Sequence, residues 1–447
     1  MEASVGLMPY CNPTGLWTGI MWGDTPKYCR GFKNDVFISK QDREILRRLA
    51  EKVRLIATEP SQDEKRELWY DHNSLKTRRP VVLCDPENGW NEIVTEDKVE
   101  CEGDLARRWE VTLRKEIFWG ESIRDDRPIE PYFYIGYTYD ESGWGVDLQY
   151  IGGHEGGAYT WNTPIEKIED IQKLRFPEIE VDYKTTLETL ALAGEVFAGL
   201  LDVRLRGVWW WSFGMTVDLI RMVGLTQMMM YMYDNPTLLH RVMDFLSKGN
   251  LGRLDFLEEN GLLSLNNNDS YIGSGGIGYC REIPARDVDT SYVKTIDLWG
   301  FSESQETVGV SPAMYEEFVF QYQLPILKRF GLNCYGCCEP VDTRWHILKT
   351  IPNLRRLSVS AWADRKKMSE YLQDNYIFSW KPNPAFLAVP HLDEEGARKY
   401  VRETLEIAKG CILEIIMKDN HTIGHNPENV KNWVKIVRDE IERQHSL

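Results

Sequence analysis

The chain contains 447 residues, of which 43% are hydrophobic and 27% are charged, and its formal net charge is −16. This apolar content is enough for one large core or two ordinary domains, and it argues against a disordered chain. The excess of acidic residues gives a surface that repels phosphate backbones and anionic lipids, so we expect neither nucleic acid nor membranes as partners.

The cellular location is predicted from the N-terminus and the cysteines. The opening MEASVGLMPY lacks the basic and apolar regions of a signal peptide, and no run of ~18 apolar residues occurs anywhere. The nine cysteines are an odd number and are unevenly spaced. Reduced thiols and a cytoplasmic location are therefore expected.

The N-terminal part is predicted to be an arm followed by helix. Residues 1–38 are rich in Gly, Pro and aromatic residues and show no helical period. Residues 39–58 begin with Ser39 as a plausible N-cap and continue with apolar residues at helical spacing. We expect residues 1–78 to form an N-terminal arm and helical extension, and residues 79–447 to form one catalytic domain.

Beyond residue 80, short β-like runs alternate with helical runs, which is typical of parallel α/β proteins. Strands are predicted at 81–84, 132–138, 203–211, 296–302, 332–338, 354–361, 376–380 and 411–417. Helices are predicted at 100–122, 214–232, 236–259, 311–330, 364–373 and 393–409. Eight strands separated by helices predict an α/β fold of the (β/α)8 TIM-barrel type with an N-terminal extension.

Two segments do not fit this alternation. Residues 262–267 form a ninth β-like run that exceeds the strand count. The glycine cluster GSGGIG at 273–278 lacks the GK[ST] of a phosphate-binding loop, so a flexible or tightly turned loop is the favoured interpretation.

In a TIM barrel the active site lies at the carboxyl ends of the strands, which selects candidate residues. One predicted strand ends in Trp209, Trp210 and Trp211, and alternation places the first and third on one face. Core packing and pocket lining are both open for these rings. Glu303, Ser304, Gln305 and Glu306 follow a later strand.

The segment CYGCCEP, which contains Cys337, Cys338 and Glu339, is the densest group of reactive side chains. Thiolates and carboxylates are metal ligands, although buried cysteines often serve only as small apolar residues. Asp419 and His421 follow the last strand and are candidates for proton transfer or ligation, with an ordinary surface loop as the alternative.

Four segments together resemble the uroporphyrinogen-decarboxylase superfamily over roughly residues 80–440. They are GMTVDLIRMVGLTQMMMYMYDNPTLLHRVMDFL, LWGFSESQETVGVSPAMYEEFVFQYQLPIL, SWKPNPAFLA and CILEIIMKDNHTIGHNPENVKNWV. True decarboxylases of this family carry an Arg-rich MRQAGRY-like segment at the first strand, where this chain has RPVVLCDPENGW. The thiol methyltransferases of the family hold zinc at positions that correspond here to Tyr335, Cys337 and Met417, so only one ligand is retained.

A third branch, which the YGCCEP, LRRLSVSAWAD and KPNPAFLA segments resemble, comprises substrate-side methyltransferases of O-demethylase systems. The resemblance implies that the chain demethylates a small aryl methyl ether, of the vanillate type, in anaerobic one-carbon metabolism. It also implies transfer of the methyl group to the cobalamin (cob(I)alamin) of a separate corrinoid protein. Decarboxylation of a porphyrinogen-like substrate, methyl transfer from a methylamine or betaine, and a catalytically inactive scaffold remain alternatives. A homodimer is possible.

This reaction requires an acid or metal at the ether oxygen, an aromatic slot and an open barrel mouth. The expected proton donor and its partner come from Glu339, Tyr335, Asp419 and His421. The expected substrate-binding residues are Trp209, Trp211, Tyr137, Glu306 and Asn383. If a metal such as zinc is bound, the expected ligands are Cys337, Glu339 and Asp419.

Overall fold

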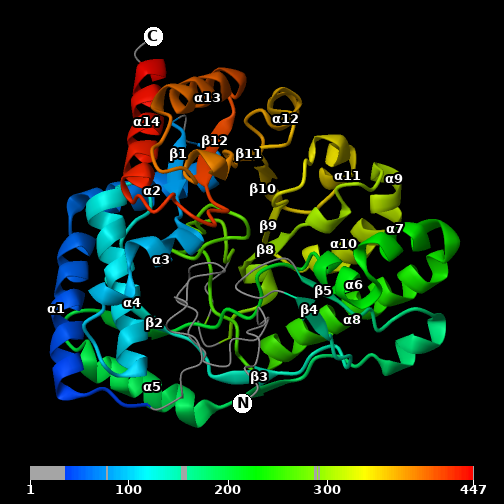
Figure 1. The fold of residues 1–447 in the computed structure, drawn as a ribbon, viewed down its shortest axis with the longest axis horizontal. Helices are drawn as coiled ribbons and strands as arrows, with labels where there is room; N and C mark the ends of the chain where they lie inside the picture. Colours follow the sequence, from blue (N-terminus) through cyan, green and yellow to red (C-terminus); the bar gives the residue numbers. More distant parts are fainter. Residues whose placement is uncertain (1–35, 77–78, 153–158, 286–288, 290–291, 446–447) are drawn as a thin grey trace.

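A six-stranded parallel sheet forms the centre of the computed structural model (Figure 1). The structure describes residues 36–445, except 77–78, 153–158, 286–288 and 290–291. The strand order is β1-β12-β11-β10-β9-β8. The strands are β1 (Val81–Cys84), β8 (Trp299–Ser302), β9 (Leu332–Tyr335), β10 (Leu354–Val359), β11 (Ile377–Trp380) and β12 (Ile412–Met417). Because all six are parallel, their carboxyl ends lie along one edge.

The remaining strands pair separately. β2 (Tyr132–Ile135) and β7 (Asp202–Leu205) form a parallel pair, which accounts for the other two predicted strands. Two short antiparallel pairs were not predicted. They are β3 (Tyr139–Glu141) with β6 (Ile179–Val181), and β4 (Tyr150–Gly152) with β5 (Tyr159–Trp161).

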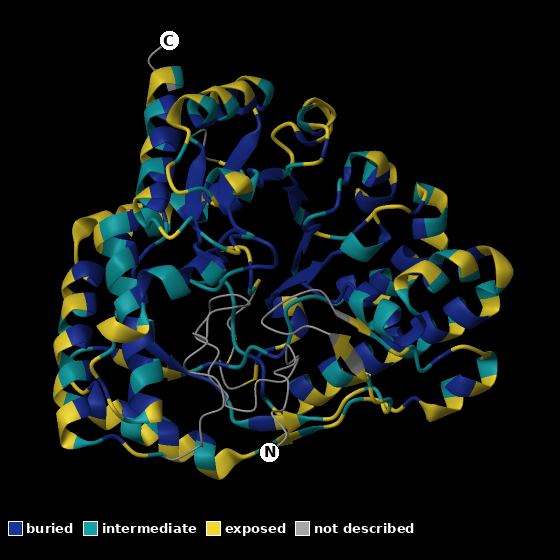
Figure 2. Cartoon of the chain, in the orientation of Figure 1, coloured by how far each residue is buried: buried dark blue, intermediate teal, exposed yellow. Residues whose placement is uncertain are grey.

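Helices surround the strands, and Figure 2 shows the strands of the sheet buried while exposed residues cover the outer faces of the helices. The longer helices are α1 (Lys40–Ala57), α2 (Pro60–Asn73), α4 (Asp104–Phe118), α5 (Tyr183–Val196), α6 (Thr216–Val223), α7 (Leu225–Asp234), α8 (Pro236–Glu259), α10 (Gln321–Leu327), α12 (Arg365–Leu372), α13 (Glu394–Ile407) and α14 (Glu428–His445). Single turns form α3 (Trp90–Ile93), α9 (Pro312–Tyr315) and α11 (Trp345–Leu348). Strands covered in this way read as continuous apolar runs, which explains why their positions were predicted from sequence.

Helix boundaries follow local capping chemistry. The Ser39 side chain accepts a hydrogen bond from the backbone N–H of Asp42, which confirms the predicted N-cap of α1. Asp364 and Asp393 cap α12 and α13 in the same way. The predicted helix 214–232 is divided into α6 and α7 at Gly224, whose φ of +85° does not continue a helix.

The predicted N-terminal extension and the sheet contribute to one hydrophobic core. Leu46, Ala50 and Val53 of α1 are buried in the same apolar cluster as the residues of β1 and β12. The predicted boundary between residues 78 and 79 stays a prediction, and the predicted arm at 1–38 lies almost entirely outside the described residues.

Closure of a barrel also stays a prediction, because strand pairing among the described residues does not run from β1 to β2 or from β7 to β8. Side chains form hydrogen bonds across both gaps. The Asp126 carboxylate accepts a hydrogen bond from the backbone N–H of Val82 at 2.8 Å. The Asn266 amide bonds both the N–H and the C=O of Trp299. This amide substitutes for a backbone ladder, which explains why the β-like run 262–267 is not a strand.

The glycine-rich segment 270–280 is tightly turned and lies against the sheet. Gly273, Gly275 and Gly276 have positive φ values. A Cβ at Gly275 would collide with Ile416 of β12, and one at Gly276 would collide with Arg356 of β10. Only glycine permits this approach, so the cluster is a packing device, as the tight-loop interpretation anticipated.

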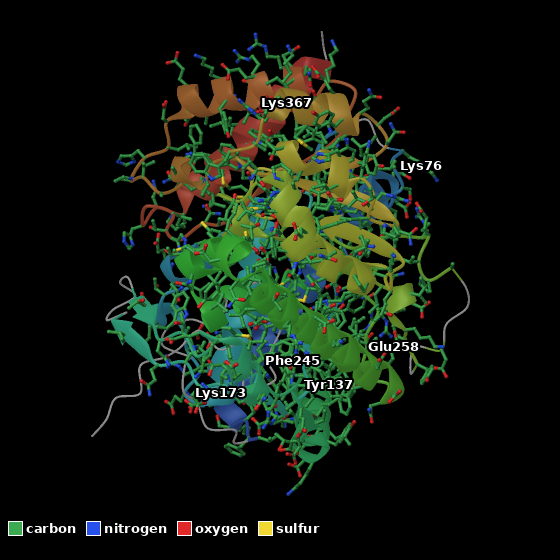
Figure 3. The ribbon with its side chains drawn as sticks, turned by 90° about the vertical axis from the view of Figure 1, so that its right-hand side faces the viewer. Lys76, Tyr137, Lys173, Phe245, Glu258 and Lys367 are labelled. Carbon is green, nitrogen blue, oxygen red and sulfur yellow. The ribbon has the colours of Figure 1, made fainter. Side chains whose placement is uncertain are left out.

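Figure 3 shows α8 crossing one side of the molecule with Phe245 and Glu258 along it. Phe245 stacks on Phe176 at a centroid distance of 4.5 Å, and the Glu258 carboxylate accepts a hydrogen bond from the backbone N–H of Thr295 at 2.8 Å. The helix therefore connects the segment that precedes β6 to the segment that leads into β8. Among the helices that the structure describes, none combines the length and apolar character that crossing a membrane requires.

Candidate functional site

Acidic and thiol side chains meet where β8, β9 and β12 end. Glu303 and Ser304 follow β8, Cys337 and Glu339 follow β9, and Lys418 follows β12. All five are buried, with exposed fractions of 4% or less. Parallel strands place these carboxyl ends at one edge, as the sequence analysis expected for an active site.

The Glu339 carboxylate is held in place by backbone donors. It accepts hydrogen bonds from the N–H of Ser304 at 2.8 Å and from the N–H of Cys337 at 2.9 Å. The turn before it needs Gly336, whose φ is +92°. These two backbone donors therefore hold the Glu339 side chain in one orientation at the strand ends.

Glu303 lies against a backbone from a different strand end. Its carboxylate accepts hydrogen bonds from the Ser212 hydroxyl at 3.2 Å and from the Gln305 N–H at 3.0 Å. A Cβ at Gly214 would collide with this carboxylate, so that position must remain glycine. Burial, together with the nearby charges of Glu306 and Glu339, raises the pKa of Glu303 well above its ordinary value.

Glu306 is the more accessible carboxyl of the pair and lies one turn beyond Glu303. Its Oε2 accepts a hydrogen bond from the Thr216 hydroxyl at 2.6 Å. Burial raises the pKa of Glu306, and the charge of Glu339 adds to this, while the bond from Thr216 acts in the opposite direction. The raised pKa values favour the protonated form of each carboxyl, and because the two groups interact, they titrate as a coupled pair.

Two thiols and an ion pair lie beside this carboxyl pair. The Sγ atoms of Cys337 and Cys338 are 3.5 Å apart, and the Cys338 thiol donates to Oδ2 of Asp419 at 3.5 Å. The Lys418 Nζ lies 3.8 Å from Cys337 Sγ and 2.5 Å from Asp419 Oδ1. Burial opposes the charge of Asp419, yet the Lys418 ammonium lowers the pKa of this carboxyl below its ordinary value.

These contacts do not fit the predicted zinc ligands. The Lys418 ammonium contacts both the Cys337 thiol and the Asp419 carboxylate, and the Glu339 carboxylate is occupied by two backbone N–H groups. No three His, Cys, Asp or Glu side chains within the described ranges are arranged to hold a metal ion. We therefore assign no role to zinc at this site.

Backbone strain marks the same edge. Glu87 after β1, Met215 after β7 and Asp419 after β12 have φ values of 47°, 61° and 61°. Residues other than glycine adopt this left-handed region at a cost of ~1–3 kcal/mol, and such residues concentrate at functional sites. Glu87 and Asp419 lie within three residues of the ends of β1 and β12, whereas Met215 is the N-cap of α6 and directly follows Gly214, which lies against Glu303.

The predicted catalytic residues Tyr335 and His421 occupy contrasting positions. Tyr335 is fully buried, and its hydroxyl lies 2.6 Å from the Tyr315 hydroxyl, 2.9 Å from Gln323 Oε1 and 3.2 Å from Ser304 Oγ. This network orients Ser304, whose N–H binds Glu339, so Tyr335 acts as a positioning residue. His421 is exposed in the loop after β12.

The predicted substrate-binding rings are divided between two environments. Trp209 is buried, stacks near Tyr137 at a centroid distance of 5.3 Å and donates its Nε1–H to the carbonyl of Leu262. Trp209 therefore takes the core-packing alternative that the sequence left open.

Trp211 is partly exposed and directly precedes Ser212, which contacts Glu303. Its ring centroid lies 5.3 Å from that of Phe301. Asn383 follows β11, and its side chain caps a short helical turn by accepting a hydrogen bond from the backbone N–H of Ala385.

Glu303 was named at a strand end by the sequence analysis but was not chosen as catalytic. The signal was its position as the first residue after a fully buried strand, where its carboxyl has little access to water. Its interaction with Glu306 and Glu339 depends on contacts between β8 and β9 that the sequence does not reveal.

A second buried charged cluster lies within the sheet and was missed from sequence. The Glu414 carboxylate bonds His72 at 3.0 Å and Arg356 at 3.0 Å. Ser379 also donates to it, and Lys381 donates to Ser379. Burial would raise the pKa of Glu414, but Arg356 and His72 lower it to about 2. Burial lowers the pKa of Lys381 to about 8.

A cavity of about 40 Å³ lies apart from both clusters, near β2 and α4. Its charged lining is paired internally, because Arg206 binds Asp269 at 3.2 Å and Arg127 binds Glu116 at 2.7 Å. Space of this size accommodates water rather than an aromatic substrate. The strand-end cluster is therefore the candidate active site.

Comparisons with known proteins assign no family to the chain. The sequence matches no protein-family model and no curated protein. Among solved structures, the fold is similar to that of a methyltransferase from Methanosarcina mazei at 12% sequence identity and a TM-score of 0.38, covering 68% of this chain and 76% of that chain. At this identity and TM-score, the likeness transfers no activity from that protein to this one.

Proposed function

We propose that the chain is a methyltransferase that demethylates a small aryl methyl ether and passes the methyl group to the corrinoid of a partner protein. The observation that carries this proposal is the carboxyl pair Glu303–Glu306, which shares raised pKa values at the strand-end edge beside the partly exposed Trp211. A phenolate oxygen leaves an ether poorly unless it receives a proton, and this pair supplies one.

Each group at the site has a role in this scheme. The reduced corrinoid supplies the nucleophile that accepts the methyl group. As the bond between the methyl carbon and the ether oxygen breaks, its electron pair moves to that oxygen, and the oxygen takes the proton held by Glu303 and Glu306. The charge of Glu339 favours the protonated form of Glu303, because a further ionised carboxyl nearby is unfavourable. The product phenol is thereby released neutral.

The same residues support a second candidate, methyl transfer from a methylated amine or betaine. Trp211 and Phe301 lie 5.3 Å apart between ring centroids near an acidic cluster, and aromatic rings with carboxylates bind quaternary ammonium groups. In that case the carboxyl pair would bind the substrate in its charged form. Decarboxylation of a polyanionic porphyrinogen is disfavoured, because Glu303, Glu306 and Glu339 present acidic groups to the substrate.

The test is methyl transfer to free cob(I)alamin or a corrinoid protein, followed by the appearance of the methylcobalamin absorption band. Conversion with methoxyarenes and loss of conversion in Glu303→Gln support the proposal. The exposed Glu188 on α5 provides the matched control Glu188→Gln, which is expected to retain the rate. Conversion with amines alone would select the second candidate, and no conversion with any donor would overturn both.

A further inference from the structure

We propose that Cys337 and Cys338 form an oxidation site, a dithiol that peroxide converts reversibly into a disulfide between adjacent residues. Their sulfur atoms are already in contact at 3.5 Å. Cys338 is partly exposed, so an oxidant can reach it, whereas Cys337 is 4% exposed and lies behind it. A partly exposed thiol next to a buried partner is the arrangement in which one cysteine is oxidised and the other resolves it.

The neighbouring charges support each step of the reaction. Cys338 donates its S–H hydrogen to Asp419, which can accept the proton as the sulfur attacks hydrogen peroxide. A sulfur–oxygen bond forms, the oxygen–oxygen bond breaks, and the released hydroxide takes the proton to become water. The Cys337 sulfur then attacks the sulfenic acid, and the second hydroxide leaves with the Cys337 proton. Two thiols and one peroxide thus yield one disulfide and two waters.

The resulting disulfide is expected to be strained and easily reduced. Consecutive Cα atoms are about 3.8 Å apart, whereas disulfides usually join Cα atoms separated by about 4.4–6.8 Å. Strained disulfides have higher reduction potentials and belong to the labile class rather than the structural class. A dithiol that returns readily to its reduced form suits a reversible modification.

Oxidation would also alter the carboxyl site, a consequence that rests on the proposed function. The Cys337 N–H donates to the Glu339 carboxylate at 2.9 Å, and the Cys337 carbonyl accepts from the Ser358 hydroxyl at 3.2 Å. Ring closure twists the peptide between the two cysteines and changes the direction of these groups. Glu339 then loses part of its anchoring, so we expect methyl transfer to slow when the disulfide forms.

The experiment treats the reduced full-length protein with hydrogen peroxide and follows the tryptic peptide 330–344, which contains Cys334, Cys337 and Cys338. We expect the peptide to lose about 2 Da, the mass of two hydrogens, and to retain a single alkylatable thiol. Dithiothreitol should restore all three. Cys334→Ser must still lose this mass, and Cys338→Ser must not.

Two results would overturn the proposal. One is a peptide with all three thiols intact at a peroxide dose that oxidises a free thiol. The other is added oxygen on Cys338 without loss of hydrogen, because it shows that Cys337 does not resolve the sulfenic acid. Both readouts are masses, so they stand even if no methyl donor is found. Where transfer is measurable, the rate should fall in proportion to the oxidised fraction, and Cys338→Ser should remove that sensitivity.

Discussion

The strand-end cluster and the cluster within the sheet both bury carboxyl groups, yet their protonation is opposite. Burial and other carboxyls raise the pKa of Glu303, whereas Arg356 and His72 lower the pKa of Glu414 to about 2 against the same effect of burial. The difference teaches that neighbouring charges decide which form of a buried acid is stable. A paired carboxylate such as Glu414 serves the fold, whereas an acid kept protonated such as Glu303 can donate a proton.

The largest expected effect is a loss of stability when the ion pair between Arg356 and Glu414 within the sheet is broken. Arg356→Met leaves Glu414 with His72 and no guanidinium, so the free energy of unfolding should fall by about 3–5 kcal/mol. Urea unfolding at pH 7 measures the loss. Arg281→Met is the control, because Arg281 pairs with Glu67 at the surface and exposed pairs contribute about 1 kcal/mol or less. Equal losses in the two variants would remove the distinction between the clusters.

The second-largest expected effect is on the rate of methyl transfer and follows from replacing Glu303. Glu303→Gln keeps the acceptor for Ser212 but removes the transferable proton, so methyl transfer should fall by about 10²-fold or more. The free energy of unfolding should not fall, because a neutral amide replaces an acid whose raised pKa favours its neutral form. The measurement pairs single-turnover kinetics with urea unfolding. If the variant is destabilised but keeps full activity per folded molecule, Glu303 stabilises the fold, as Glu414 does, and does not donate the proton.

The pH dependence of stability should differ in sign between the clusters. The folded pKa of Glu414 lies below its unfolded value, so its stabilisation is present above about pH 4.5 and is lost as pH falls towards 2. The folded pKa of Glu303 is raised, so its favourable contribution is present at low pH and is lost as pH rises through that pKa.

Thermal unfolding against pH tests this sign directly. Glu303→Gln should become more stable relative to the unaltered protein as pH rises above about 4.5, the ordinary pKa of this carboxyl. A difference between the two proteins that is independent of pH would show that Glu303 is ionised throughout.

The positions of the strands could be predicted from the sequence, whereas the contacts between residues on different strands could not. The two buried clusters show why. The strands bearing Glu303 and Glu414 were located because both faces of a covered sheet are apolar over short runs. Strand 203–211 was predicted too long, because Trp209 bonds Leu262 and packs with Tyr137 instead of continuing the sheet. The site was predicted at the carboxyl edge of the strands, where the structure gathers acidic and thiol side chains. The proximity of Glu303 to Glu339, or of Arg356 to Glu414, depends on strand register. Residues so far apart in sequence carry no local signal of that register.

The smallest expected effect is a shift in the pH dependence of the rate, which tests whether Glu306 shares the transferable proton with Glu303. Thr216 donates to Glu306 at 2.6 Å and thereby lowers the pKa of this carboxyl relative to burial alone. Thr216→Val keeps the shape but removes the donor, so the pKa of the pair should rise, because a hydrogen bond to the charged form is lost. Because the protonated pair is the active form, the alkaline limb of the rate profile should move to higher pH with little change in the maximal rate. Measurement of transfer rates across that limb decides the point: a limb that stays in place would mean that Glu306 does not share the proton, and one that moves to lower pH would mean that the ionised pair is the active form.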